Sequence, residues 1–167
     1  WFSGDSALSE ENKCTIHTSW SSNENWPYDW SETCNSEPVV FQPQTKEELQ
    51  TAVDLWVDDN ASALTTYGEI NTWDVSLITD MSNLFNDKSE FNEDLSNWDV
   101  SNVASMNAMF LNATSFNQDL SSWDVSNVTN MQSMFRGATG FNSDVSNWNV
   151  SNAVSYTHLT LPTKLSV

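Results

Sequence analysis

Apolar side chains recur at a fixed spacing of 25 residues along the second half of the chain. The recurring positions are Trp73, Trp98, Trp123 and Trp148; Val75, Val100, Val125 and Val150; Met81, Met106 and Met131; Phe85, Phe110 and Phe135; and Phe91, Phe116 and Phe141. A repeat of this length indicates units that stack and share one continuous apolar core. We therefore expect the four tryptophans to be buried core residues and not an exposed stacking surface.

Each repeat opens with an alternating segment, represented by Asn97–Ser101. In a strand, alternate side chains point to opposite faces, so Trp98 and Val100 would face the core and Asp99 would face solvent. The preceding Leu95 completes the L-x-x-L-x-L spacing of a leucine-rich repeat, with Trp in the second apolar place. The pattern predicts one short parallel strand in each repeat.

A second apolar pattern follows in each repeat, where Met106, Met109 and Phe110 have the i, i+3, i+4 spacing of a helical face. It predicts a short helical turn in each unit. The expected fold class is thus α/β: a leucine-rich-repeat-like solenoid with short parallel strands, helical turns and an N-terminal capping helix. About 3.5 repeats would occupy residues 61–153.

The segment 45–60 predicts the amphipathic capping helix. Thr45-Lys-Glu-Glu48 is a capping-box pattern that typically begins a helix. One helical face carries the apolar residues Leu49, Ala52, Val53, Trp56 and Val57. Such a helix would cover the exposed end of the first repeat.

The chain is strongly acidic, with 23 Asp and Glu against 5 Lys and Arg and a formal charge of −18. This balance argues against nucleic acid, whose phosphates require clustered cations, and against anionic membranes. No apolar run is long enough to span a bilayer. The sequence contains no recognised catalytic motif, so we expect no enzyme activity and no cofactor.

An acidic column is expected on the outer side of the predicted strands, formed by Asp74, Asp99 and Asp124, with Asn149 in the fourth unit. It could bind a cationic partner or a shared Ca²⁺, although no segment has the spacing of an EF-hand loop. Alternatively, each side chain could accept a hydrogen bond from the following Val-Ser-Asn turn, which the sequence favours. We predict no metal site.

Two other polar series have the same period. Their members are Asp94, Asp119 and Asp144, expected in the turn before each strand, and Asn92, Asn117 and Asn142. Amides stacked at a corner of the repeat can hydrogen-bond from unit to unit, so we expect the Asn series to be structural.

Several features favour an extracellular or cell-surface location. The only cysteines, Cys14 and Cys34, could form one disulfide, which would require an oxidising compartment. The sequence also contains glycosylation sequons at Asn60, Asn112, Asn127 and Asn149. Because the chain begins at Trp1, we expect it to be a fragment or a processed product, in which a signal peptide would not be seen.

The repeat running from Val128-Thr-Asn-Met131 through Met134-Phe135 and Phe141-Asn to Trp148 resembles that of BspA-like leucine-rich surface proteins. The resemblance covers about residues 46–152. It implies a surface-exposed interaction or adhesion module without family-wide catalytic residues.

The two ends differ from the repeat. Residues 1–44 form a polar leader rich in Trp, with both cysteines inside it. Residues 154–167 depart from the repeat, and Val154–Thr163 resembles a translated sequencing-library adapter, which predicts a non-native tail. The last repeat would then lack a neighbour, and we expect fraying or self-association at Val145–Asn152.

The expected function is noncatalytic binding of a protein or matrix ligand through the strand-bearing face. Two alternatives remain. A carbohydrate-binding module would use Trp26 and Trp30 in the leader, and a structural spacer of a larger surface protein would bind no partner.

Overall fold

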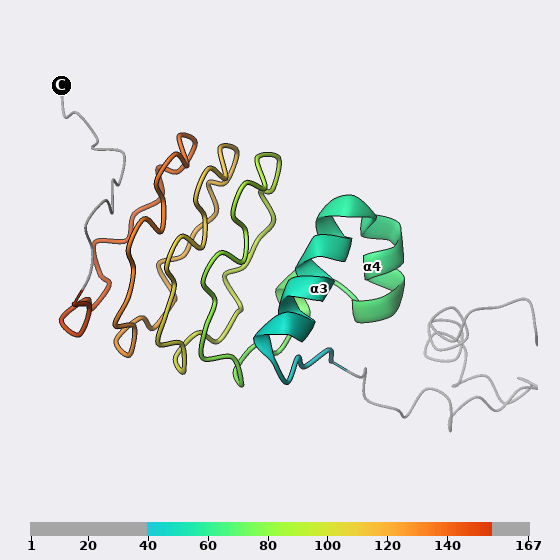
Figure 1. The fold of residues 1–167 in the computed structure, drawn as a ribbon, viewed down its shortest axis with the longest axis horizontal. Helices are drawn as coiled ribbons and strands as arrows, with labels where there is room; N and C mark the ends of the chain where they lie inside the picture. Colours follow the sequence, from blue (N-terminus) through green and yellow to red (C-terminus); the bar gives the residue numbers. More distant parts are fainter. Residues whose placement is uncertain (1–39, 155–167) are drawn as a thin grey trace, which may run out of the picture. The chain divides into compact units, whose positions relative to one another are not determined.

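The computed structural model describes residues 40–154 of the 167-residue chain. Its elements are α3 (Lys46–Asp58), α4 (Asn60–Tyr67) and the short 3₁₀ helix η1 (Ile70–Thr72). Three coils follow, which we define as residues 69–93, 94–118 and 119–143, and residues 144–154 begin a fourth. Figure 1 shows the coils side by side, with α3 and α4 at the N-terminal end of the row.

The helix expected at 45–60 is present as α3, with Thr45 as its N-cap. The Thr45 side chain accepts a hydrogen bond from the Glu48 N–H at 3.2 Å. The Glu48 carboxylate in turn accepts from the Gln44 N–H at 2.7 Å, one residue before the partner that a capping box predicts. Of the five predicted apolar positions, four are buried, and Val57 is 39% exposed. The prediction for Val57 was therefore wrong.

Helix α4 was not predicted. Asp59 separates it from α3 and caps it, because its carboxylate accepts from the Ser62 N–H and hydroxyl. These hydrogen bonds from Ser62 lower the pKa of Asp59. Only Ala63 of α4 is buried, so this helix lacks the broad apolar stripe that would identify it in the sequence. The remaining signals are Asp at the start and Gly68, at φ +72°, at the end.

The core is continuous from α3 to the start of the fourth coil. The four repeated tryptophans are buried, which confirms their prediction as core residues. The phenylalanines form columns in which equivalent rings stack nearly parallel. Phe110 lies 5.1 Å from Phe85 and 5.5 Å from Phe135 between ring centroids. Aromatic stacking thus links each coil to the next.

The predicted fold class was wrong, because residues 40–154 contain two short helices and no named strand or sheet. Only isolated parallel bridges join Asp80 to Ser105 and Ser105 to Asn130. The expected strand at Asn97–Ser101 is a short segment between two turns. These turns close through the bonds from Trp98 N–H to Leu95 C=O and from Val103 N–H to Val100 C=O. The alternation was nevertheless correct: Trp98 and Val100 are buried, and Asp99 is exposed.

The expected helical turns are also absent, because every coil contains residues with positive φ in that region. Each coil has two such residues: Asn83 and Asp87, Ala108 and Asn112, and Ser133 and Gly137. Equivalent residues of successive coils are 25 positions apart. A left-handed residue continues neither a right-handed helix nor a strand. The side chains of Met106, Met109 and Phe110 are still buried as expected. The sequence pattern therefore identified the buried side but not the backbone that produces it.

The alternating backbone directs hydrogen bonds from each coil to the next. In the first coil, the N–H groups of Met81, Asn83, Phe85 and Asp87 donate to the carbonyls of Ser105, Asn107, Met109 and Leu111, at 2.8–2.9 Å. In the second, Met106, Ala108, Phe110 and Asn112 donate in the same way to Asn130, Gln132, Met134 and Arg136, at 2.8–2.9 Å. Along this side of the coils, the N–H groups of these alternate residues face forward, toward the next coil. The carbonyls that accept from them face backward, toward the preceding coil.

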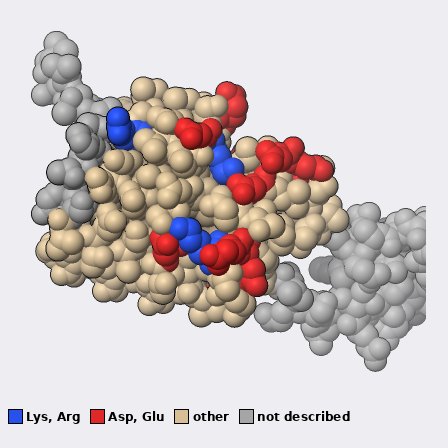
Figure 2. Space-filling view, in the orientation of Figure 1, with Lys and Arg blue, Asp and Glu red and all other residues tan. Residues whose placement is uncertain are grey.

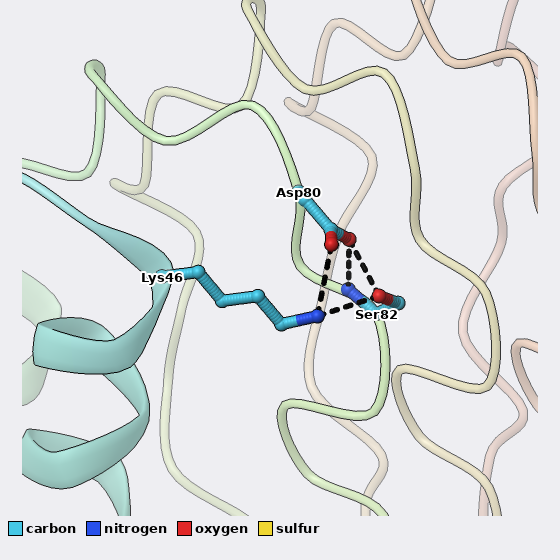
Figure 3. A network of polar contacts seen from close by, with 3 residues as sticks. All are labelled: Lys46, Asp80 and Ser82. Atoms are coloured by element: carbon cyan, nitrogen blue, oxygen red, sulfur yellow. Dashed lines mark hydrogen bonds and ion pairs between the residues drawn. The ribbon is translucent and has the colours of Figure 1, made fainter.

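The backward-facing side of the first coil lies against α3. Gln50 Nε2 donates to the Leu84 carbonyl at 3.1 Å, and Lys88 pairs with Asp54 at 2.6 Å. Lys46 Nζ reaches both the Asp80 carboxylate, at 2.9 Å, and the Ser82 hydroxyl, at 2.6 Å (Figure 3). Trp56 meets Trp73 edge to face, with ring centroids 5.8 Å apart. The predicted cap therefore contacts the first coil through both apolar and polar groups.

Candidate functional site

The acidic column has the same local geometry in all four units. One side-chain oxygen of each residue accepts from the N–H two residues ahead: Ser76 for Asp74, Ser101 for Asp99, Ser126 for Asp124 and Ser151 for Asn149, at 3.0–3.2 Å. These are the turn hydrogen bonds that the structural alternative predicts. Because Asn149 makes the same bond as the carboxylates, the turn requires an acceptor but not a charge.

The remaining carboxylate oxygens of the column differ between the coils. Asp74 is half-buried, and its Oδ2 accepts from Gln42 Nε2 at 2.6 Å. Asp99 and Asp124 are exposed, and within the described segment 40–154 only the serine of its own turn is shown donating to each carboxylate. The column thus presents two oriented carboxylates on neighbouring coils.

The turn hydrogen bonds favour the ionised carboxylates. Hydrogen bonds from the Ser126 hydroxyl and N–H lower the pKa of Asp124, and those from Ser76 do the same for the pKa of Asp74. Both acids therefore keep their charge to a lower pH than an unperturbed Asp. This charge is available to an oppositely charged partner at neutral pH.

The second acidic series also forms turns. Asp94, Asp119 and Asp144 accept from the N–H groups of Ser96, Ser121 and Ser146, each at 2.9 Å. The pKa of Asp119 is lowered by the backbone and side chain of Ser121, although the Asp144 carboxylate opposes this shift. Repulsion between neighbouring coils is therefore weaker than the local hydrogen bonding.

The Asn series links successive coils. Asn92 Oδ1 accepts from the Asn117 N–H at 2.8 Å, and Asn117 Oδ1 accepts from the Asn142 N–H at 2.7 Å. This confirms the predicted structural role. A further series was missed in the sequence: the side-chain amides of Asn102, Asn127 and Asn152 donate to the carbonyls of Ser76, Ser101 and Ser126 one coil earlier. These three asparagines also recur every 25 residues, and this period in the sequence could have identified them.

The four asparagines of the sequons are all exposed. Asn112 and Asn127 use their Nδ2 atoms in bonds to the preceding coil, with Asp87 Oδ1 and the Ser101 carbonyl as acceptors. Asn60 begins α4, and Asn149 uses its Oδ1 in a turn. Glycosylation at these residues stays a prediction.

Charged side chains are scattered over the described part of the chain (Figure 2). The described face in Figure 2 has separate acidic and basic groups and no broad basic patch. Residues 40–154 contain no group of three or more His, Cys, Asp or Glu side chains placed to hold a metal ion. Among these residues, no helix is long and apolar enough to cross a bilayer.

A shallow pocket of about 280 Å³ lies at the N-terminal end and was not predicted. Its lining residues are Phe41, Glu47, Glu48, Thr51 and Tyr67. The Phe41 and Tyr67 rings lie 4.4 Å apart, and the Glu48 carboxylate is already bound to the Gln44 N–H.

The family model described as "Mycoplasma protein of unknown function, DUF285" matches residues 55–163, more than half of the chain. The chain belongs to this family. The match includes α4 and all three coils, so the 25-residue repeat of this DUF285 chain lies inside the family region. Neither a curated protein nor a solved structure matches the chain. The resemblance to BspA-like proteins stays a prediction.

Several predictions fall outside the described residues of the DUF285 chain. They concern the disulfide between Cys14 and Cys34, the sugar-binding alternative at Trp26 and Trp30, and the adapter-like sequence that follows Val154. Fraying at Val145–Asn152 and self-association also stay predictions.

Proposed function

We propose that this DUF285 chain is a noncatalytic protein-binding module whose coils present the acidic column to a cationic partner. The observation that carries the proposal is the pair of exposed carboxylates at Asp99 and Asp124, each oriented by hydrogen bonding within its own turn. A fixed orientation lowers the entropy that binding must remove. Lysine and arginine side chains of a protein or matrix ligand have the complementary charge.

The proposal places this module outside the cell or at its surface. The exposed sequons at Asn60, Asn112, Asn127 and Asn149 support this assignment. Adhesion is the corresponding role for a module displayed on a surface.

The test removes charge without removing the turn. Asn149 shows that Asn accepts the turn hydrogen bond, so the double variant Asp99→Asn/Asp124→Asn should keep the fold and lose only two charges. A matched control, Asp94→Asn/Asp119→Asn, removes the same charge from the second acidic series. The probe is a lysine-rich hexapeptide, titrated by calorimetry at physiological ionic strength.

The proposal predicts that the column variant binds at least about tenfold more weakly, equivalent to ~1.4 kcal/mol, while the control changes affinity by about twofold or less. Equal losses in the two variants would show that net charge alone attracts the peptide. That result would contradict a site at the column.

A further inference from the structure

The shallow pocket at the N-terminal end is built from three segments of the described chain. Phe41 precedes α3, while Glu47, Glu48 and Thr51 lie in the first two turns of α3, and Tyr67 is the last residue of α4. Its volume of about 280 Å³ is at the lower end of the range for ligand pockets. It therefore suits one side chain or a molecule of similar size.

Two aromatic rings supply the apolar lining of this pocket. Phe41 and Tyr67 are half-buried, and their ring planes are inclined by 47°. Both rings meet Trp73 edge to face, with centroids 5.2 Å and 5.9 Å from the indole. Trp73 is 2% exposed and belongs to the continuous core, so it holds both rings in place. A preformed lining loses little conformational freedom when a ligand binds.

The polar lining offers mainly hydrogen-bond acceptors. The Thr51 hydroxyl donates its proton to the Glu47 carbonyl at 2.8 Å, which leaves the hydroxyl oxygen free to accept. The Glu48 carboxylate accepts from the Gln44 N–H through Oε2, and a carboxylate has further acceptor positions. A ligand that donates several hydrogen bonds matches this lining.

The pocket is also negatively charged. Within residues 40–154, neither Glu47 nor Glu48 forms an ion pair. Lys46 lies beside them in α3, but its ammonium binds Asp80 and Ser82 of the first coil instead. The two carboxylates are therefore available to a cation, and the faces of aromatic rings attract cations as well.

We propose that this pocket binds the ammonium end of a lysine side chain from another polypeptide. Lysine combines an apolar stem with a compact cationic head that has three donors. The stem would lie against the Phe41 and Tyr67 rings, and the head would meet the carboxylates and the Thr51 oxygen. A side chain reaching in from a neighbouring surface fits a shallow pocket, whereas a free small molecule needs burial of most of its surface. The pocket shares no residue with the acidic column, so this inference goes beyond the proposed function.

The experiment titrates the full chain with Nα-acetyl-lysine N-methylamide, a single lysine with blocked ends, and follows the chemical shifts by NMR. The norleucine analogue of this probe keeps the stem without the charge, and n-butylamine keeps stem and charge without the polypeptide backbone. Two chain variants are compared. Glu47→Gln removes one charge from the pocket, and the matched control Asp58→Asn removes one charge from the exposed C-terminal end of α3.

The proposal predicts saturable shifts at Glu47, Thr51 and Tyr67, with a dissociation constant on the order of 1–10 mM for so small a ligand. The norleucine analogue should bind at least about tenfold more weakly, because it lacks the cation. Glu47→Gln should weaken binding of the blocked lysine about threefold, as expected for an exposed charge pair, and Asp58→Asn should change it less than about 1.5-fold.

Several results would overturn the proposal. No saturable shift at the pocket would exclude the site, and equal binding of the norleucine analogue would show that the cation is not recognised. Equal weakening by Glu47→Gln and Asp58→Asn would assign the attraction to net charge. Binding of n-butylamine without binding of the blocked lysine would assign the pocket to a free amine. The Asp99→Asn/Asp124→Asn chain should keep the pocket shifts, and their loss there would contradict a site separate from the acidic column.

Discussion

The two ends of the coil row differ in their hydrogen-bonding chemistry. At the N-terminal end, the Leu84 carbonyl of the first coil accepts from Gln50 of α3. Two ion pairs join the same surfaces: Lys46 of α3 pairs with Asp80, and Lys88 of the coil pairs with Asp54 of α3. At the C-terminal end of the described row, residues 144–154 begin a fourth coil on the third, and the Val154 N–H donates to the Thr129 carbonyl at 2.9 Å. Between the coils, backbone bonds run in both directions, since the Met106 N–H donates forward to the Asn130 carbonyl and the Thr129 N–H donates back to the Ala104 carbonyl. An amphipathic helix with polar side chains supplies the donors at the first end.

The largest expected effect compares an interior coil with the last described coil. Phe110 is fully buried between Phe85 and Phe135, so Phe110→Ala should cost about 3–5 kcal/mol of unfolding free energy. Phe135→Ala should cost less, because Phe135 has a ring neighbour of the Phe110 column on one side only among the described residues. Urea denaturation measures both values. Equal losses would indicate that Phe135 is packed as tightly as the interior Phe110.

The N-terminal end can be tested by removing its donor. Gln50→Met keeps most of the side-chain volume but leaves the Leu84 carbonyl without its partner. We expect a loss of about 1–3 kcal/mol, the usual cost of an unsatisfied buried polar group. The control is Gln44→Met, at an exposed position before α3. If the two variants were equally stable in urea, the cap would depend on apolar packing alone.

At a left-handed residue we expect a substitution to raise the stability of the protein. Ala108 has φ +53°, a conformation that costs a non-glycine residue about 1–2 kcal/mol, so Ala108→Gly should stabilise the protein by about 0.5–1 kcal/mol. Ala113→Gly, at a buried position without positive φ, should destabilise it by about 1 kcal/mol. Thermal unfolding distinguishes them. A loss of stability in both variants would argue for the helical turn that the sequence suggested.

The smallest effect concerns pH. Hydrogen bonds from Ser126 lower the pKa of Asp124 below its ordinary value of 3.8. A lowered folded-state pKa stabilises the fold above the unfolded value, and this contribution disappears as pH falls through the folded-state pKa. The melting temperature of the chain should therefore fall more steeply below about pH 4 than that of Asp124→Asn, which cannot titrate. Parallel curves would contradict this contribution from Asp124.

The sequence predicted the buried side of the fold better than its backbone. Trp98, Val100, Met106 and Phe110 were assigned to the core correctly, because their period depends only on which side faces inward. The helical turns were wrong because Ala108 and Ser133 adopt left-handed φ values that their residue types do not favour. The Ala108 N–H donates to the Gln132 carbonyl of the next coil, and such nonlocal bonds leave no mark in a local pattern.

The candidate site could be predicted only in part. The period identified the acidic column and its turns, since Asp followed by Val-Ser is a local pattern that the structure retains at Asp99 and Asp124. The backbone bonds between coils could not be found in the same way, because they join residues 24 positions apart, as from Met106 to Asn130.

Central to this fold are the backbone hydrogen bonds that the first and second coils each donate forward to the next coil. NMR detection of scalar couplings across hydrogen bonds tests them directly, by correlating a donor nitrogen with its acceptor carbonyl carbon. The account predicts correlations from Phe85 to Met109, from Met106 to Asn130 and from Phe110 to Met134. Correlations in the evenly spaced pattern of a parallel strand ladder at Trp98–Val100, with none for these pairs, would contradict it.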